Sequence, residues 1–205
     1  MFIIKMKKTA LILLMSFIVI MPIKTMMAQF SADMIIHNNE DERTFRIFCD
    51  ENRYRYEFDQ DGQEGILIAL NDTEEFYLLL PSQKTAFKSD GSSQMTMSTD
   101  PVRQYEYYTG DAEEVIAGRE NVNGYPCLKK ELRKIKKDEF GTSNQLMYTI
   151  WYSEELKFPV KMKNHIDGTG NSFELKNIED WTPQKSSFQV PEEYRIIDQS
   201  MMRQY

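Results

Sequence analysis

Residues 43–58 read RTFRIFCDENRYRYEF, and apolar and polar side chains alternate on both sides of the polar segment at 50–52. Successive side chains of a β-strand point to opposite faces, so this period of two predicts two half-buried strands joined by a turn. The residues expected on the apolar faces are Phe45, Ile47 and Cys49 before the turn and Tyr54, Tyr56 and Phe58 after it.

The same rhythm continues along the chain in both directions. Turn signals such as Asn123-Gly124 come about every 8–12 residues, which is typical of an all-β meander. The expected strands cover residues 30–37, 43–49, 53–58, 65–70, 75–80, 114–117, 127–136, 145–152, 158–166 and 172–180, with 85–87 as a short edge strand. About ten or eleven short strands would leave exposed edges in a flat sheet. We therefore predict a mainly β fold, a curved antiparallel sheet that forms an incomplete β-barrel.

Residues 88–110 interrupt this pattern. Asp100-Pro101 can begin a helix, because proline fits the first helical position, so residues 102–108 are expected to form a short helix or an aromatic loop. A long insert in a compact β domain is usually functional or mobile. We predict that it supplies one or two short helices that cover one opening of the sheet.

The first 28 residues resemble an export signal. Lys5, Lys7 and Lys8 precede an apolar run at 10–23, and Ala28 offers a small residue for cleavage. The alternative is a membrane anchor, but Pro22 and Lys24 shorten the run below the roughly 20 apolar residues that a spanning helix needs. The expected domains are a signal peptide at 1–28, one β domain at 29–187 and an extended tail at 188–205, in a periplasmic or secreted protein.

The charge of the chain excludes some partners. The chain of 205 residues has a formal charge of −7, and loss of residues 1–28 would lower it to −11 because that segment holds four lysines and no acid. An acidic protein without a basic tail is not expected to bind nucleic acid. We expect a soluble monomer after cleavage, since like charges repel.

The sequence offers no catalytic constellation, metal site or cofactor motif. His37 and His165 are its two histidines, and neither belongs to a pattern of metal ligands. The adjacent carboxylates, for example Glu113-Glu114, would point to opposite faces of a strand and cannot act as an acid–base pair. We therefore predict no catalytic residue, no metal site, no cofactor and no enzymatic activity.

Cys49 and Cys127 are the two cysteines. Export would permit a disulfide between them. Cys49 is on the same strand face as Ile47, which is expected to be buried. Cys127 is on the same face as Lys129, which would be exposed to solvent if Leu132 points inward. Both a disulfide and two reduced thiols remain open from the sequence.

Residues 129–137 read KKELRKIKK, a basic segment in an otherwise acidic chain. One interpretation is a docking face for anionic lipid or an acidic protein partner. The other is an edge strand that its lysines protect against aggregation, with acidic strands alongside as intramolecular partners.

The apolar faces of four consecutive strands are the best candidates for a ligand site. If the sheet closes on these side chains they form a core, and if a helix or loop covers a half-open sheet they line a cavity that could hold an acyl chain. The candidate cavity residues are Phe45, Ile47, Tyr54, Tyr56, Ile66, Ile68, Phe76, Leu78 and Leu80.

Several short motifs resemble the LolA-like superfamily of exported lipoprotein-sorting proteins, in particular its uncharacterised members. The matching stretches are residues 53–57 (RYRYE), 75–81 with 84–87, 118–125, and 151–161, and together they span about residues 43–180. The resemblance implies an incomplete barrel closed by helices over an apolar cavity, in a periplasmic protein that handles lipid or lipoprotein. Arg55 corresponds to the strand arginine of the family, and no carrier role follows for it.

Two functions are consistent with these patterns. The first is a non-enzymatic periplasmic protein that binds or carries a lipid or lipoprotein acyl chain. The second is an envelope interaction or sensor module on the same scaffold, with a protein partner and no carried ligand. Lipid that copurifies with the protein would favour the first, and a dry, fully packed interior would favour the second.

Overall fold

The structure, a computed structural model, describes residues 29–199 except 39–40, 61, 139–140 and 167–170. The expected signal peptide at 1–28 lies outside the described residues. Among the described residues, no helix has the length and apolar character needed to cross a membrane.

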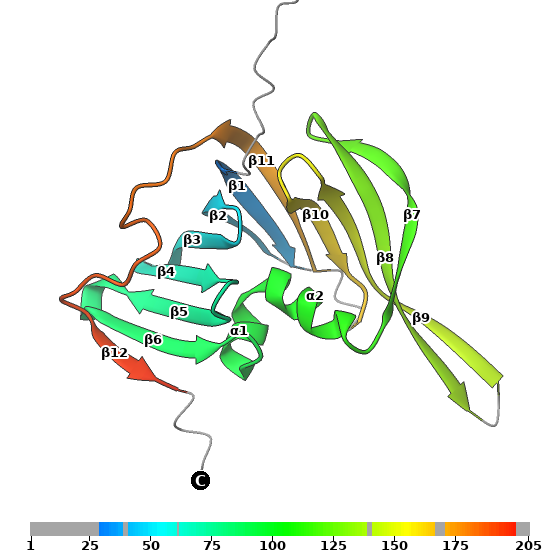
Figure 1. Cartoon of the computed structure of the whole chain (residues 1–205), viewed down its shortest axis with the longest axis horizontal. Helices are drawn as coiled ribbons and strands as arrows, with labels where there is room; N and C mark the ends of the chain where they lie inside the picture. Colours follow the sequence, from blue (N-terminus) through cyan, green and yellow to red (C-terminus); the bar gives the residue numbers. More distant parts are fainter. Residues whose placement is uncertain (1–28, 39–40, 61, 139–140, 167–170, 200–205) are drawn as a thin grey trace, which may run out of the picture.

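Twelve strands form one sheet, with neighbours in the order β12-β6-β5-β4-β3-β2-β1-β11-β10-β9-β8-β7 (Figure 1). The strands are β1 (Gln29–Asn38), β2 (Asp41–Asp50), β3 (Arg53–Gln60), β4 (Gln63–Leu70), β5 (Glu75–Leu80), β6 (Thr85–Asp90), β7 (Glu113–Val122), β8 (Tyr125–Asp138), β9 (Gly141–Ser153), β10 (Phe158–Asn164), β11 (Ser172–Asp180) and β12 (Arg195–Asp198). A 3-10 turn, η1 (Pro81–Gln83), joins β5 to β6. Every strand pair is antiparallel except β12 with β6, which is parallel.

The sheet curves without closing, and β12 and β7 are its two edges. Two short helices, α1 (Gln94–Thr99) and α2 (Pro101–Thr109), lie in its concave side (Figure 1). The predicted curved, incomplete barrel with short covering helices is confirmed. The described residues contain more strands than the sequence indicated, because the C-terminal segment adds β12 to the edge of β6.

The main core fills the concave side and contains the predicted alternating residues of β2 and β3. Ile47, Cys49, Tyr54 and Tyr56 are all buried there. A smaller core lies on the outer face of β4, β5 and β6, where the connection at 181–194 crosses the sheet and buries Phe188. The segment expected to be an extended tail from residue 188 thus contributes both a core side chain and a strand.

The face assigned to Ile66 and Ile68 from the sequence is wrong. Cα partners in adjacent strands share a face, and Tyr56 pairs with Leu67, not with either isoleucine. Leu67 therefore points into the concave side, and Ile66 and Ile68 belong to the outer core. The physical reason is that β4 is apolar on both faces, so its pattern does not say which face meets the main core, and the strand register decides.

The basic segment at 129–137 lies in β8. Up to Arg133 this strand pairs with β7 on one side and β9 on the other, and beyond Arg133 it pairs with β9. The interpretation as an edge strand is therefore wrong for this inner part. Acidic neighbours do accompany it, since Lys129 pairs with Glu120 at 2.6 Å and Lys130 with Glu114 at 2.8 Å. The outer ends of β8 and β9 project from the body of the sheet as a two-stranded arm (Figure 1).

Both cysteines are buried free thiols. Cys49 is in the main core as expected, and Cys127, for which the solvent-exposed face was only a conditional expectation, is 1% exposed and belongs to the same core. The two histidines have local partners: His37 Nδ1 lies 3.2 Å from Glu42, and His165 Nε2 lies 3.0 Å from the Thr149 hydroxyl.

Candidate ligand-binding cavity

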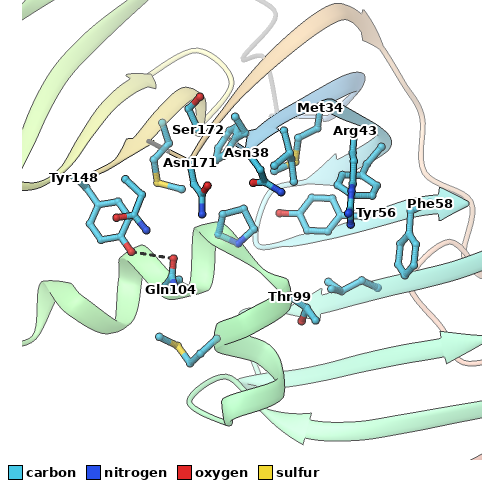
Figure 2. A pocket seen from close by; sticks show the side chains of 18 of the residues that line it. Met34, Asn38, Arg43, Tyr56, Phe58, Thr99, Gln104, Tyr148, Asn171 and Ser172 are labelled. Carbon is cyan, nitrogen blue, oxygen red and sulfur yellow. Dashed lines mark hydrogen bonds between the residues drawn. The ribbon is translucent and has the colours of Figure 1, made fainter. Parts of the chain in front are cut away.

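A cavity of about 370 Å³ lies between the concave face of the sheet and the two helices (Figure 2). We call it the first cavity. Every strand from β5 to β9 in the sheet order contributes to its wall, and α1 and α2 supply the opposite wall. Its lining residues are Met34, Ile36, Asn38, Arg43, Phe45, Tyr56, Phe58, Leu67, Leu78, Met97, Thr99, Pro101, Gln104, Tyr148, Met162, Asn164, Asn171, Ser172 and Phe173.

The floor of the first cavity is apolar because strand register brings apolar side chains of neighbouring strands to the same level. Met34 on β1 pairs with Phe45 on β2, and Leu67 on β4 pairs with Leu78 on β5. Directly opposed side chains share one face of the sheet. The floor is therefore a continuous apolar stripe across the strands, although each strand contributes only one or two residues to it.

One side of the first cavity is polar. Asn38 ends β1, Asn164 ends β10, and Asn171 and Ser172 lie at the start of β11, with Arg43 near the start of β2. The backbone amide of Asn164 donates to the carbonyl of Asn171 at 2.8 Å, which brings these strand ends together. We call these five residues the rim. They come from the same end of four adjacent strands, β2, β1, β11 and β10.

Asp100 fixes α2 over the sheet. Its carboxylate accepts from the backbone amides of Val102 at 2.9 Å and Arg103 at 3.3 Å, which caps the helix N-terminus. It also accepts from the Tyr54 hydroxyl at 2.6 Å and the Tyr56 hydroxyl at 3.3 Å. One buried carboxylate thus joins the helix to the strand β3 beneath it.

Burial sets the ionisation of this cluster. Burial raises the pKa of Asp100. The hydrogen bonds that Asp100 accepts from Tyr54 and from the backbone amides of Arg103 and Val102 lower this pKa, but the effect of burial is larger. Burial also raises the pKa of Tyr54 and Tyr56 well above the usual range, and the Asp100 charge adds to this effect. Both hydroxyls therefore keep their protons at neutral pH and remain donors to Asp100.

Aromatic packing fixes the other end of α2. Tyr105 meets Tyr148 of β9 edge to face, with ring centroids 5.7 Å apart. The Tyr148 hydroxyl donates to Gln104 Oε1 at 3.0 Å, an interaction visible in Figure 2. Val102, one turn earlier, is buried in the main core. The helix is therefore held along its whole length and divides the concave side into two spaces.

The space on the other side of α2 is a second cavity of about 330 Å³. It combines aromatic residues with acids and bases: its lining residues are Cys49, Glu51, Asn52, Arg53, Tyr54, Asn71, Val102, Tyr105, Glu106, Glu114, Lys130, Ile150, Tyr152, Leu156, Lys157, Phe158 and Pro159. Burial pushes the pKa of Glu114 upward, but hydrogen bonds from Lys130 and Tyr105 outweigh it, so the pKa lies below its usual value.

The predicted cavity residues divide among several places. Phe45, Tyr56 and Leu78 line the first cavity, and Tyr54 lines the second. Ile47 and Phe76 are fully buried in the main core without lining either cavity. Ile66 and Ile68 lie on the outer face, as described above, and Leu80 is partly buried at the end of β5 and lines neither cavity.

Several floor residues do not stand out in the sequence. Met34, Met162 and Phe173 come from β1, β10 and β11, outside the four consecutive strands from which the candidates were drawn. Each lies in a stretch expected to be a strand, but no local pattern indicates that β11 and β10 follow β1 in the sheet. Met97 and Gln104 were missed because a helix over the sheet was expected without a face being assigned to it.

Several solved structures superpose on this chain. An uncharacterised conserved protein from Thermus thermophilus superposes with a TM-score of 0.54 at 10% identity, over 85% of this chain and 93% of that one. A LolA superfamily protein from Nitrosomonas europaea matches with a TM-score of 0.41 at 10% identity, over 78% and 90% of the two chains. MucB in its complex with MucA, from Pseudomonas aeruginosa, matches with a TM-score of 0.48 at 12% identity, over 82% of this chain but 58% of that one.

At these identities the likeness concerns the fold alone. The superfamily that the sequence motifs resemble is among the structural matches. No protein-family model matches the chain, and no curated protein matches it.

Proposed function

We propose that this protein is a non-enzymatic, exported protein that binds an acyl chain of a lipid or lipoprotein in the first cavity. The observation that carries the proposal is the apolar floor formed beneath α1 and α2 by Met34, Phe45, Leu67 and Leu78 together with the facing methionines and aromatic rings. The volume of the first cavity, about 370 Å³, falls in the range of about 300–1,000 Å³ that is usual for small-molecule sites.

The chemistry of the lining suits binding and not catalysis. Among the described residues that line the first cavity, Arg43 is the single charged side chain, and none is an acid, a histidine or a cysteine. The tyrosine hydroxyls in the wall already donate to Asp100 and Gln104. A surface of this kind excludes water from an apolar chain, and each buried methylene contributes about 0.8 kcal/mol.

The proposal places the mature protein outside the cytosol as a soluble monomer, in the periplasm or secreted. The N-terminal pattern at 1–28 supports export, and the acidic charge supports solubility.

The alternative, an envelope interaction or sensor module without a carried ligand, is favoured by one feature. The arm formed by the outer ends of β8 and β9 projects from the sheet and exposes Ile135. An arm of this kind could contact an envelope protein without any use of the cavity.

Native mass spectrometry of the full-length chain, expressed in a cell that exports it, tests the proposal. We expect a mass that lacks the first 28 residues and carries an additional acyl-lipid mass that is released at higher collision energy. The same protein should bind the fluorescent chain of cis-parinaric acid. A bare protein that also fails to bind the probe contradicts the proposal and favours the interaction module.

A cavity-filling variant locates the binding site. Leu78→Trp directs a large ring into the first cavity and should weaken probe binding at least about tenfold, since its ring occupies the space of the chain. Tyr152→Trp is the matched control, because it adds the same ring at the second cavity. Equal affinities for the two variants, both folded by circular dichroism, would place the probe elsewhere.

A further inference from the structure

We infer that the ligand of the first cavity is a single-chain amphiphile with an anionic head, a carboxylate or a phosphate, and that Arg43 at the rim binds this head. The inference rests on the proposed function and adds the chemical class of the ligand.

Arg43 lies on the cavity side of the sheet. Its Cα partner on β1 is Ile36, which also lines the first cavity, and two residues further along β2 is Phe45 of the floor. Its side chain keeps 42% of its surface exposed, so the guanidinium lies at the boundary between the cavity and water. In the view of Figure 2, Arg43 lies between Asn38 and Phe58.

The guanidinium retains free donors. Its Nε donates to Asp41 Oδ2 at 2.8 Å, which anchors the side chain. No hydrogen bond among the described residues uses its two terminal nitrogens. A guanidinium fixed in this way can present two parallel N–H groups to a carboxylate or phosphate, a charge-assisted geometry that is stronger than a neutral hydrogen bond.

The surroundings of Arg43 favour an anion. The other rim residues, Asn38, Asn164, Asn171 and Ser172, are uncharged and can donate to oxygen atoms. No acid of the described part of the chain lines the first cavity. His37 and Glu42, whose Nδ1 and Oε2 atoms lie 3.2 Å apart, occupy the register position that alternates with Ile36 and Arg43, so they point to the other face. Asp41 is a neighbouring carboxylate, and the Nε–H of Arg43 already pairs with it.

The position of the rim avoids the cost of burying a charge. A carboxylate moved into an apolar interior would lose its hydration and shift its pKa instead. At the rim the head keeps contact with water while the chain extends along the apolar floor. A volume of about 370 Å³ lies near the lower end of the usual range for ligand sites, which favours one chain over two.

Isothermal titration calorimetry with three probes of equal chain length tests the inference: dodecanoate, dodecyl phosphate and dodecanol. We expect the two anions to bind at least about tenfold more tightly than the alcohol at low salt. The preference should shrink as salt is added, because exposed charges are screened. The tighter of the two anions then identifies the head as carboxylate or phosphate.

Two arginine variants complete the test. Arg43→Gln should remove the preference, so that dodecanoate binds no more tightly than dodecanol. Arg119→Gln is the matched control, because Arg119 is an exposed arginine on β7 paired with Glu154 at 3.3 Å, and it should retain the preference.

The outcomes separate this inference from the proposed function. Equal affinity for all three probes, or an unchanged preference in Arg43→Gln, overturns the anionic head but leaves acyl-chain binding intact. Absence of binding of every probe to the unmodified protein overturns both.

Discussion

The two cavities lie on opposite sides of one helix against one sheet, yet they differ in chemistry. The first cavity has an apolar floor and a single charge at its rim among the described residues, whereas the second is lined by acids and bases. Several charges of the second cavity have partners within the protein, as Lys130 pairs with Glu114 and Arg103 with Glu106. The first cavity leaves the terminal donors of Arg43 without partners in the part of the chain that the structure describes.

Under the proposed function, the first cavity binds the ligand, and the second cavity supports the fold. The Tyr105 hydroxyl of α2 donates to Glu114 of β7, and this carboxylate also pairs with Lys130 of β8, so these groups already satisfy one another. Apolar walls with unused donors at one end offer interactions that an amphiphilic ligand can complete. Asp100 is the residue on which the partition depends, because it joins the start of α2 to β3.

The largest expected effect comes from Asp100→Ala. Loss of the helix cap costs about 0.5–2 kcal/mol, and the tyrosine hydroxyls left without an acceptor add about 1–3 kcal/mol. We expect the free energy of unfolding, measured in urea, to fall by about 2–4 kcal/mol. The released helix should also let the two cavities merge, so the variant should accept bulkier apolar probes than the unmodified protein.

Asp72→Ala is the control for this change, because Asp72 lies exposed in the turn between β4 and β5. If both variants unfold at the same urea concentration, Asp100 does not maintain the partition.

A smaller effect should follow from Asp100→Asn, which keeps a helix-capping oxygen but removes the charge. Because burial raises the pKa of Asp100, the folded protein holds its proton in a window from the usual value of 3.8 upward. The unfolded chain releases that proton first, so the unmodified protein loses stability as the pH rises through this window, and the variant does not.

The difference in unfolding free energy between variant and unmodified protein should therefore increase with pH, by at most about 1.4 kcal/mol per pH unit. Two other acids also change stability with pH. Hydrogen bonds from Asn177 and Arg46 lower the pKa of Asp33, and the hydrogen bond from Lys88 lowers the pKa of Glu75. Both acids therefore stabilise the fold as the pH rises. They act equally in both proteins and cancel. A difference that stays constant from pH 3 to pH 7 would show that the pKa of Asp100 is the same in the folded and unfolded protein, so that burial does not raise it.

The smallest effect is expected for Tyr105→Phe, which changes only the second cavity. The Tyr105 hydroxyl donates to Glu114, and Lys130 still pairs with that carboxylate when the hydroxyl is gone. We expect a loss of about 0.5–1.5 kcal/mol in urea and a rise in the pKa of Glu114, followed by nuclear magnetic resonance of its side-chain carboxyl. Binding in the first cavity should not change.

Tyr107→Phe, at a tyrosine that is 56% exposed on the same helix, is the control. Weaker acyl-chain binding in Tyr105→Phe than in this control would mean that the two cavities are not independent.

Local patterns were sufficient where one face of a strand is polar. The alternation in β2 and β3 correctly placed Phe45, Ile47, Tyr54 and Tyr56 on the concave side. Asp100-Pro101 correctly marked the start of a helix, because a capping carboxylate and a proline at the first position satisfy the helix terminus by themselves. In β4 both faces are apolar, and there the pattern could not assign Ile66 and Ile68.

The sequence alone determined the curved β architecture, the helical insert and the strands that carry the apolar residues, because these follow from side-chain period and from turn and capping residues close together in the chain. Only the tertiary structure decided that Met34, Phe173 and Met162 join Phe45 in one floor and that Arg43 and Asn171 both lie at its rim. Those neighbours depend on how β1 pairs with β11 and β11 with β10. The first pairing joins strands distant in the chain and the second joins consecutive strands, and in both the register is set by packing of the whole sheet, which no local period encodes.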